Sequence, residues 1–183
     1  AERIVEPADG EWFELEGRRM QAIYTEGHAK HHYVLHDPAS RGVFTGDSFG
    51  VSYRETDTAN GAIGFPTTTP IDFDPDEAHK SIDRILGCDP EYAYLTHYSR
   101  ITDLEPYAAG LHAALDDYVA IANDCEALPD RVEVLEARLF DYMCERLAQH
   151  GMNADRDTMW SVMNIDARLN AQGLSVWLDR RKQ

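Results

Sequence analysis

The histidine-rich stretch at residues 24–50 decides how this chain folds, and it reads YTEGHAKHHYVLHDPASRGVFTGDSFG. It contains four of the chain's eight histidines and, near its end, the tripeptide Thr45-Gly46-Asp47. Short β-prone runs cover residues 20–25, 33–36 and 42–45. Residues 37–42 supply the Pro and Gly of a tight connection between the last two runs. The pattern therefore predicts a hairpin that carries Asp47 at its rim.

Three residues of metal-ligand type each follow a predicted strand. His28 follows the run at 20–25, Asp47 follows the run at 42–45, and His97 follows a strand that we expect at 92–96. Strand ends can converge at one rim of a sheet, and imidazole with carboxylate is a suitable ligand set for zinc, iron or manganese. The alternative is that the two histidines are ordinary surface or core residues and the aspartate belongs to a turn, because spacing alone matches often by chance.

The rest of the chain is predicted to be a long loop followed by helices. Residues 53–72 are rich in Thr, Gly, Pro and Asn, which is typical of a functional or disordered loop. A helix should then start with Asp74 as its cap and Pro75 in its first turn, and end at Gly87. Apolar spacing predicts three further helices, which begin near residue 105, after Pro129 and near residues 155–157.

Composition narrows the class of protein. At 183 residues the chain suits one globular unit, which we divide into a strand-rich part at 1–104 and a helical extension at 105–183. No apolar run approaches the ~20 residues that cross a bilayer, so a membrane protein is not expected. A formal net charge of -16 disfavours nucleic acid as a partner. The start of the chain has no signal-peptide pattern and no Met, so we read residue 1 as a processing boundary.

The three cysteines are far apart and form no C-x-x-C pair. We expect buried, reduced thiols in a cytoplasmic protein.

The order of the motifs resembles that of a known superfamily. Thr25-Glu26-Gly27-His28, then Phe44-Thr45-Gly46-Asp47, then Leu95-Thr96-His97 resemble the third, fourth and fifth metal motifs of the metallo-β-lactamase-fold hydrolases. The Pro-Thr-Thr-Thr-Pro segment at 66–70, the Ser-Ile-Asp-Arg-Ile helix at 81–85 and the end of the chain at 169–181 are similar to a bacterial branch of that superfamily. The resemblance implies part of an αββα sandwich, in which a helical tail covers the sheet.

The resemblance also implies a role for each motif residue. His28 would bind the first metal ion, Asp47 would bridge two ions, and His97 would bind the second. A carboxylate suits the bridging role because its two oxygens can address two cations. Two zinc ions, or iron or manganese, would then activate water and polarise a carbonyl. The implied reaction is hydrolysis of a small ester, thioester or lactone-like substrate.

The sequence departs from the family pattern in two places. Glu26 replaces the usual proline before the glycine of the third motif, and the H-x-H-x-D-H signature of the first two motifs is absent from all 183 residues. The chain therefore resembles the carboxyl-terminal half of such an enzyme. Three ligands out of about six or seven in a complete site should bind metal weakly. We expect little activity from the chain alone, and association with a missing half or with a second copy.

Several other residues could border the site. Tyr53 lies on the loop after Asp47, while Asp166 and Asn170 are one helical turn apart and could face either substrate or a buried helix contact. His31 and His32 are expected to support the ligands through hydrogen bonds. We expect the stripe with Trp160 and Trp177 to be core. The remaining histidines are expected at the surface: His36, His79, His112 and His150.

Two other functions remain open at this stage. One is a mononuclear iron oxygenase of the same fold, whose metal set would also use His28 and Asp47. The other is an interaction domain that keeps the fold without metal or chemistry; the retained motif residues argue against it, and the absent signature argues for it. The substrate, the metal and the presence of an upstream half cannot be read from the sequence.

Overall fold

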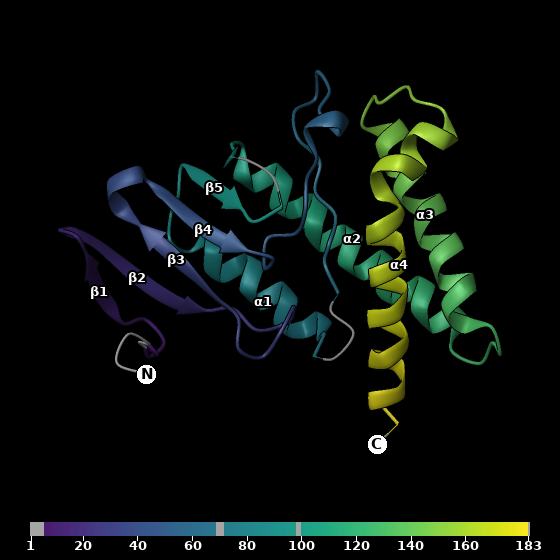
Figure 1. Cartoon of the computed structure of the whole chain (residues 1–183), viewed down its shortest axis with the longest axis horizontal. Helices are drawn as coiled ribbons and strands as arrows, with labels where there is room; N and C mark the ends of the chain where they lie inside the picture. Colours follow the sequence, from purple (N-terminus) through teal and green to yellow (C-terminus); the bar gives the residue numbers. More distant parts are fainter. Residues whose placement is uncertain (1–5, 69–71, 98–99, 183) are drawn as a thin grey trace.

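The computed structural model describes residues 6–68, 72–97 and 100–182, and within these ranges it is a mixed α/β structure. Figure 1 shows the sheet on one side of the molecule, α3 and α4 on the other, and α2 running between them. The strands are β1 (Trp12–Leu15), β2 (Arg18–Tyr24), β3 (Tyr33–Asp37), β4 (Gly42–Gly46), β5 (Tyr92–Leu95) and β6 (Arg100–Ile101). The helices are α1 (Pro75–Leu86), α2 (Leu104–Cys125), α3 (Arg131–Gln149) and α4 (Arg156–Arg180), with short 3-10 turns at Pro38–Ser40 and Arg54–Thr56.

The strand directions bring three strand ends to one edge of the sheet. The strands lie in chain order from β1 to β6. β2 and β4 are both antiparallel to β3, and β5 is parallel to β4 across the α1 connection. The carboxyl ends of β2, β4 and β5 therefore point to the same edge. The loops that follow these three strands start side by side.

Helix α1 forms where its sequence signals predict it. The Asp74 carboxylate caps the helix by accepting a hydrogen bond from the Glu77 N–H at 3.1 Å, and Pro75 occupies the first turn. Its apolar side, with Ile82 and Ile85, is buried in the same cluster as Val43 of the sheet. The predicted helix over residues 75–86 is confirmed, and it covers one face of the sheet.

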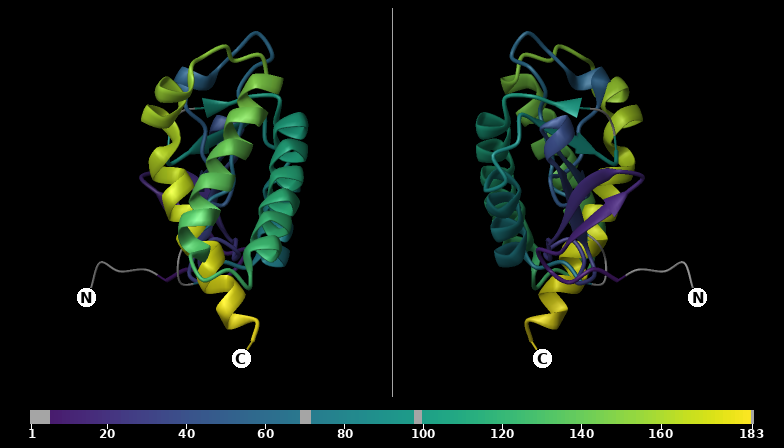
Figure 2. Two further views of the ribbon diagram at one scale, coloured as in Figure 1. Left: turned by 90° about the vertical axis from the view of Figure 1, so that its right-hand side faces the viewer. Right: turned by 90° about the vertical axis from the view of Figure 1, so that its left-hand side faces the viewer.

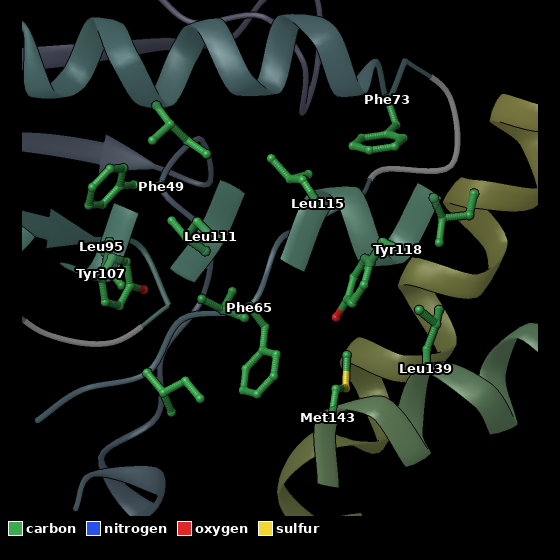
Figure 3. Packing of buried hydrophobic residues seen from close by; sticks show 14 of the residues in the cluster. Phe49, Phe65, Phe73, Leu95, Tyr107, Leu111, Leu115, Tyr118, Leu139 and Met143 are labelled. Carbon is green, nitrogen blue, oxygen red and sulfur yellow. The ribbon is translucent and has the colours of Figure 1, made fainter. Parts of the chain in front are cut away.

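One buried cluster joins the sheet to all four helices. Phe49 and Phe65, from the segment after β4, pack beside Leu111 of α2, and Tyr118 lies between Leu115 and Met143 (Figure 3). Figure 2 shows α2, α3 and α4 as three long helices beside one another. α2 begins at Leu104, at the predicted boundary between the two parts. The division into two parts itself stays a prediction.

The opposite face of the sheet carries exposed aromatic side chains. Register places Tyr94 beside Phe44, and Phe44 in turn beside Leu35. Phe44 is 43% exposed and stacks on Tyr94 with ring centroids 4.9 Å apart, and Tyr33 is 45% exposed. An apolar sheet face is normally covered in a stable protein. This face is therefore a candidate surface for association, and association itself stays a prediction.

Two expectations about the interior need correction. Trp177 is buried, but Trp160 is 38% exposed and packs against Phe140, so it lies outside the core stripe, which Met163 continues into the first turns of α4. Cys125 is buried, whereas Cys88 and Cys144 are only partly buried; all three are free thiols.

Thr69 and Pro70 of the Pro66–Pro70 segment lie outside the described residues. Within the described ranges no helix is long and apolar enough to cross a membrane.

Candidate metal centre

The three predicted ligands lie together at the edge where β2, β4 and β5 end. The His28 Nε2 atom is 3.5 Å from Asp47 Oδ2, and the His97 Nε2 atom is 3.2 Å from Asp47 Oδ1. Asp47 therefore sits between the two imidazoles and presents one carboxylate oxygen to each. The convergence that the sequence predicts is present in the structure, while metal binding by these residues stays a prediction.

Thr67 fixes the orientation and the tautomer of His28. The Thr67 Oγ1 atom donates to the Asp47 carbonyl oxygen at 2.9 Å and lies 2.9 Å from His28 Nδ1. A hydroxyl has one hydrogen, so Thr67 Oγ1 must accept from a protonated His28 Nδ1. Burial lowers the pKa of His28 and so favours the neutral ring, although the Asp47 carboxylate acts in the opposite direction. The unprotonated Nε2 then faces Asp47.

The donor set fits a metal ion. With His28 in this tautomer, Nε2 and Asp47 Oδ2 are two electron-rich atoms 3.5 Å apart, and both can act as donors to one cation. Asp47 Oδ1 is buried and makes no hydrogen bond among the described residues; its 3.2 Å contact with His97 Nε2 is an ion pair without hydrogen-bond geometry. Neutral imidazole and carboxylate are the usual ligands of zinc, iron and manganese. Within the described ranges no group of three or more His, Cys, Asp or Glu side chains is placed so that it could hold a metal ion, so the fit rests on the donor chemistry.

His32 supports the centre by holding the backbone at Asp47. Its Nε2 atom accepts from the Asp47 N–H at 3.1 Å, and its Nδ1 atom lies 2.9 Å from Ser48 Oγ and 3.1 Å from Thr25 Oγ1. Burial and, to a smaller extent, the charge of the neighbouring His28 lower the pKa of His32. The ring is therefore neutral, which leaves its Nε2 atom free of a hydrogen so that it can accept from the Asp47 N–H. The position matches the supporting role that the sequence predicts for His32. His31 is exposed.

Gly46 allows the close approach of His32. Its φ of +52° lies in the left-handed region, and a Cβ at this position would lie 2.4 Å from the His32 Nε2 atom. A side chain would displace the ring that holds Asp47. The glycine before the aspartate is thus required by both the backbone conformation and the packing.

Tyr53 and Asp166 form a pair on the His97 side of the centre. The Tyr53 hydroxyl donates to Asp166 Oδ2 at 2.8 Å. Burial raises the pKa of Asp166, against the Tyr53 hydrogen bond and the charge of His97. Burial and the Asp166 carboxylate in turn raise the pKa of Tyr53. The two side chains come from the loop after β4 and from α4, and Asp166 is close enough to His97 to feel its charge. Their predicted role as substrate contacts stays a prediction.

Asn170 holds the loop that carries Thr67. The Asn170 Oδ1 atom accepts from the Thr68 N–H at 2.7 Å, and its Nδ2 donates to the Pro66 carbonyl oxygen at 3.1 Å. The side chain is only 3% exposed. Of the two roles that the sequence leaves open for Asn170, the structure shows the buried helix contact. A Cβ at Gly173 would lie 2.6 Å from the Thr68 carbonyl oxygen, so α4 approaches this loop closely.

Thr67 is the residue that sequence reasoning undervalued. The Thr67–Thr69 run is explained equally well by turn structure, and no local pattern indicates that one hydroxyl joins atoms 20 and 39 residues away. The only signal is its place in a Pro- and Thr-rich loop after a candidate ligand. Thr25 and Ser48, which contact His32, were missed for the same reason.

Two cavities lie in this part of the molecule. A small one of about 20 Å³ is lined by His28, Asp47 and Thr67. A larger one, about 530 Å³, lies between the loop at residues 54–64, the start of α2 and the end of α3. None of the three predicted ligands lines that larger cavity. The small cavity is therefore the one that adjoins the centre.

Comparison with known proteins identifies the family. The sequence profile of the metallo-beta-lactamase superfamily matches residues 3–97, which include His28, Asp47 and His97. The chain belongs to this superfamily. Members of the superfamily generally bind metal ions. A curated relative, the metallo-beta-lactamase fold-containing protein ST1585 of Sulfurisphaera tokodaii, is 42% identical over 71 residues, which are 38% of this chain and 23% of that protein.

Solved structures of this superfamily share the fold. A beta-lactamase domain protein from Burkholderia ambifaria superposes with a TM-score of 0.57 at 16% identity, over 98% of this chain and 48% of that one. The metallo-beta-lactamase family protein TTHA1429 of Thermus thermophilus superposes with a TM-score of 0.55 at 19% identity, over 96% and 48%. The predicted α/β fold with a helical C-terminal region is confirmed. The chain spans about half the length of these solved relatives.

Proposed function

We propose that this chain supplies His28, Asp47 and His97 to the metal centre of a metal-dependent hydrolase. One observation carries the proposal: both imidazoles converge on the two oxygens of one carboxylate, and one of those oxygens is buried without a hydrogen bond among the described residues. A pair of zinc ions suits this arrangement, because each imidazole would serve one ion and Asp47 would serve both.

The residues of the chain position the centre, and a metal supplies the chemistry. A metal bound there would lower the pKa of water and polarise the substrate carbonyl. Thr67 keeps His28 in the tautomer that leaves Nε2 available as a donor, and His32 holds the backbone of Asp47. Supporting hydrogen bonds of this kind raise ligand basicity and fix ring orientation.

The proposed substrate is a small ester, thioester or lactone. We assign Tyr53 and Asp166 to contact the substrate, because Asp166 feels the charge of His97 and accepts a hydrogen bond from Tyr53. Asn170 would act indirectly, by holding the loop at Pro66 and Thr68 that shapes the same wall. These assignments rest on position around the centre, since the chain's low identity to solved relatives supports the fold alone.

We further propose that ligands outside these 183 residues complete the centre. The sequence contains no H-x-H-x-D-H signature, and three ligands hold a metal less tightly than a full set. The exposed aromatic face of the sheet, with Tyr33 and Phe44, offers a surface for the segment or second copy that brings them. The 183-residue chain alone should therefore hydrolyse its substrate slowly.

The test is metal-dependent hydrolysis by the natural full-length protein. A panel of small esters, thioesters and lactones would be assayed with zinc, iron and manganese, beside the variants Asp47→Asn and Asp124→Asn. Asp124 is 77% exposed at the end of α2 and serves as the matched control. The proposal expects activity that Asp47→Asn abolishes and Asp124→Asn retains. Hydrolysis that survives Asp47→Asn or complete metal removal would refute it.

A further inference from the structure

A second pair of histidines lies between α1 and α2. His79 of α1 and His112 of α2 have ring centroids 4.9 Å apart and ring planes within 2° of parallel. Their Nδ1 atoms are only 2.6 Å apart. The sequence predicts both as ordinary surface histidines, but their side chains are 28% and 29% exposed and face each other across the helix contact. A contact this short requires a positive charge or a proton between the two nitrogens.

Each ring is also held by a carboxylate on the opposite helix. The His79 Nε2 atom lies 3.3 Å from Asp116 Oδ1 of α2, and the His112 Nε2 atom lies 3.3 Å from Asp83 Oδ1 of α1. On each helix the histidine and the aspartate are four residues apart, one helical turn, so they share a face. The two helices therefore contribute matching halves to one cluster.

The ion-pair contacts favour one tautomer of each ring. A carboxylate accepts and does not donate, so a hydrogen on each Nε2, facing its aspartate, is the favoured arrangement. In a neutral ring with Nε2 protonated, Nδ1 is an unprotonated donor of electrons. Both Nδ1 lone pairs then face each other across 2.6 Å, where they repel unless a proton or a metal ion lies between them.

We propose that His79 and His112 bind one divalent transition-metal ion through their Nδ1 atoms and so link α1 to α2. Imidazole nitrogen selects zinc, nickel or copper over magnesium or calcium, which prefer oxygen ligands. A carboxylate beside the outward Nε2 of each ring, as Asp116 and Asp83 provide, is common around metal-binding histidines. The carboxylates would hold both rings with Nδ1 directed at the ion.

The geometry needs a small opening to accept the ion. Two nitrogens bound at the zinc distance of 2.0–2.1 Å in a tetrahedral site lie about 3.3 Å apart, so the rings must separate by less than about 1 Å. Both rings are partly exposed, and solvent can fill the other ligand positions. Only two protein nitrogens bind the ion. The site therefore does not require a group of three or more His, Cys, Asp or Glu ligands, and the described ranges contain none.

The pair shares no residue with the candidate hydrolase centre, so it can be tested separately. Zinc, nickel and copper would be titrated into the Asp47→Asn chain by calorimetry, with the Tm recorded at each metal concentration. We expect one bound ion and a rise in Tm. Spectra of bound copper should show two nitrogen ligands. In His79→Gln and in His112→Gln, the bound ion and the Tm rise should both disappear.

The controls separate binding from loss of structure. His36→Gln removes a histidine of β3 that packs against Trp12, and it should retain the ion and the Tm rise. Asp83→Asn and Asp116→Asn should keep the ion but bind it roughly 10- to 100-fold more weakly. Circular dichroism would verify that each variant is folded. The inference is overturned if zinc, nickel and copper all fail to bind the Asp47→Asn chain, or if binding is unchanged in both histidine-to-glutamine variants.

Discussion

Replacing Gly46 with alanine should damage the centre through His32, and a second glycine provides a matched comparison. Both Gly46 and Gly17 have positive φ, +52° and +83°. A Cβ at Gly17 would meet no atom within 4 Å, whereas a Cβ at Gly46 would lie 2.4 Å from the His32 Nε2 atom. Gly17→Ala therefore measures the backbone cost alone, and Gly46→Ala adds the displacement of His32.

The expected magnitudes follow from the contacts. A left-handed alanine costs about 1 kcal/mol, which is the whole expected loss for Gly17→Ala. In Gly46→Ala the displaced ring also loses its contacts with the Asp47 N–H, Ser48 Oγ and Thr25 Oγ1. The two Nδ1 contacts, with Ser48 and Thr25, share one ring nitrogen and count as one hydrogen bond, and the Asp47 N–H makes the second. At roughly 0.5–1.5 kcal/mol for each hydrogen bond, losing both adds about 2 kcal/mol. Gly46→Ala should thus destabilise the chain by about 3 kcal/mol.

The assay is urea unfolding of both variants and of the unsubstituted chain, followed by circular dichroism. Gly46→Ala should also bind zinc at the candidate centre roughly 10- to 100-fold more weakly, because His32 no longer holds the backbone of Asp47. Equal free energies of unfolding for the two alanine variants, within about 0.5 kcal/mol, would refute the argument that His32 packs against Gly46.

Three further predictions follow from other contacts. Thr67→Val keeps the shape but removes the hydrogen bonds that orient His28, so zinc affinity measured by calorimetry should fall roughly 10- to 100-fold, while Thr58→Val should leave it unchanged. Asn170→Leu leaves a buried backbone N–H unpaired and should lower the free energy of unfolding by about 2–4 kcal/mol, measured in urea. The buried Asp37 is desolvated, which raises its pKa, but its hydrogen bonds with Arg18 and Ser40 and the charge of Arg18 lower it below 3.8 overall. The stability that Asp37 gains from these contacts is present above the pKa that Asp37 has in the unfolded chain. It is lost as pH falls through the lower pKa that Asp37 has in the folded chain. Arg18→Met should remove this acid-dependent loss, measured by urea unfolding between pH 3 and 6; an unchanged pH slope would contradict it.

The sequence predicts elements well where local signals agree. The helix from Pro75 has an acidic cap, a proline in its first turn and a glycine at its end, and the structure places it there. Two strands were missed because their sequences are weak: β1 is four mostly exposed residues and β6 has only two. Such strands exist because a neighbour in the sheet pairs with them, which no local pattern indicates.

The candidate site was predictable only in part, for a physical reason. His28, Asp47 and His97 follow strands that run in the same direction, so their convergence follows from sheet topology. The roles of Thr67 and of the His79–His112 pair depend on side chains that meet only after helices and loops pack. Single polar residues in loops and on helix surfaces carry no periodic signal of such contacts.

The most direct test of the account is whether Asp47 is required for metal binding at the edge of the sheet. Zinc would be titrated by calorimetry into a chain carrying His112→Gln, which removes the proposed ion between α1 and α2, and into the same chain carrying Asp47→Ala as well. The account predicts zinc binding in the first chain and none in the second. Equal binding in both chains, or no binding in either at saturating zinc, would contradict the assignment of His28, Asp47 and His97 as a metal centre.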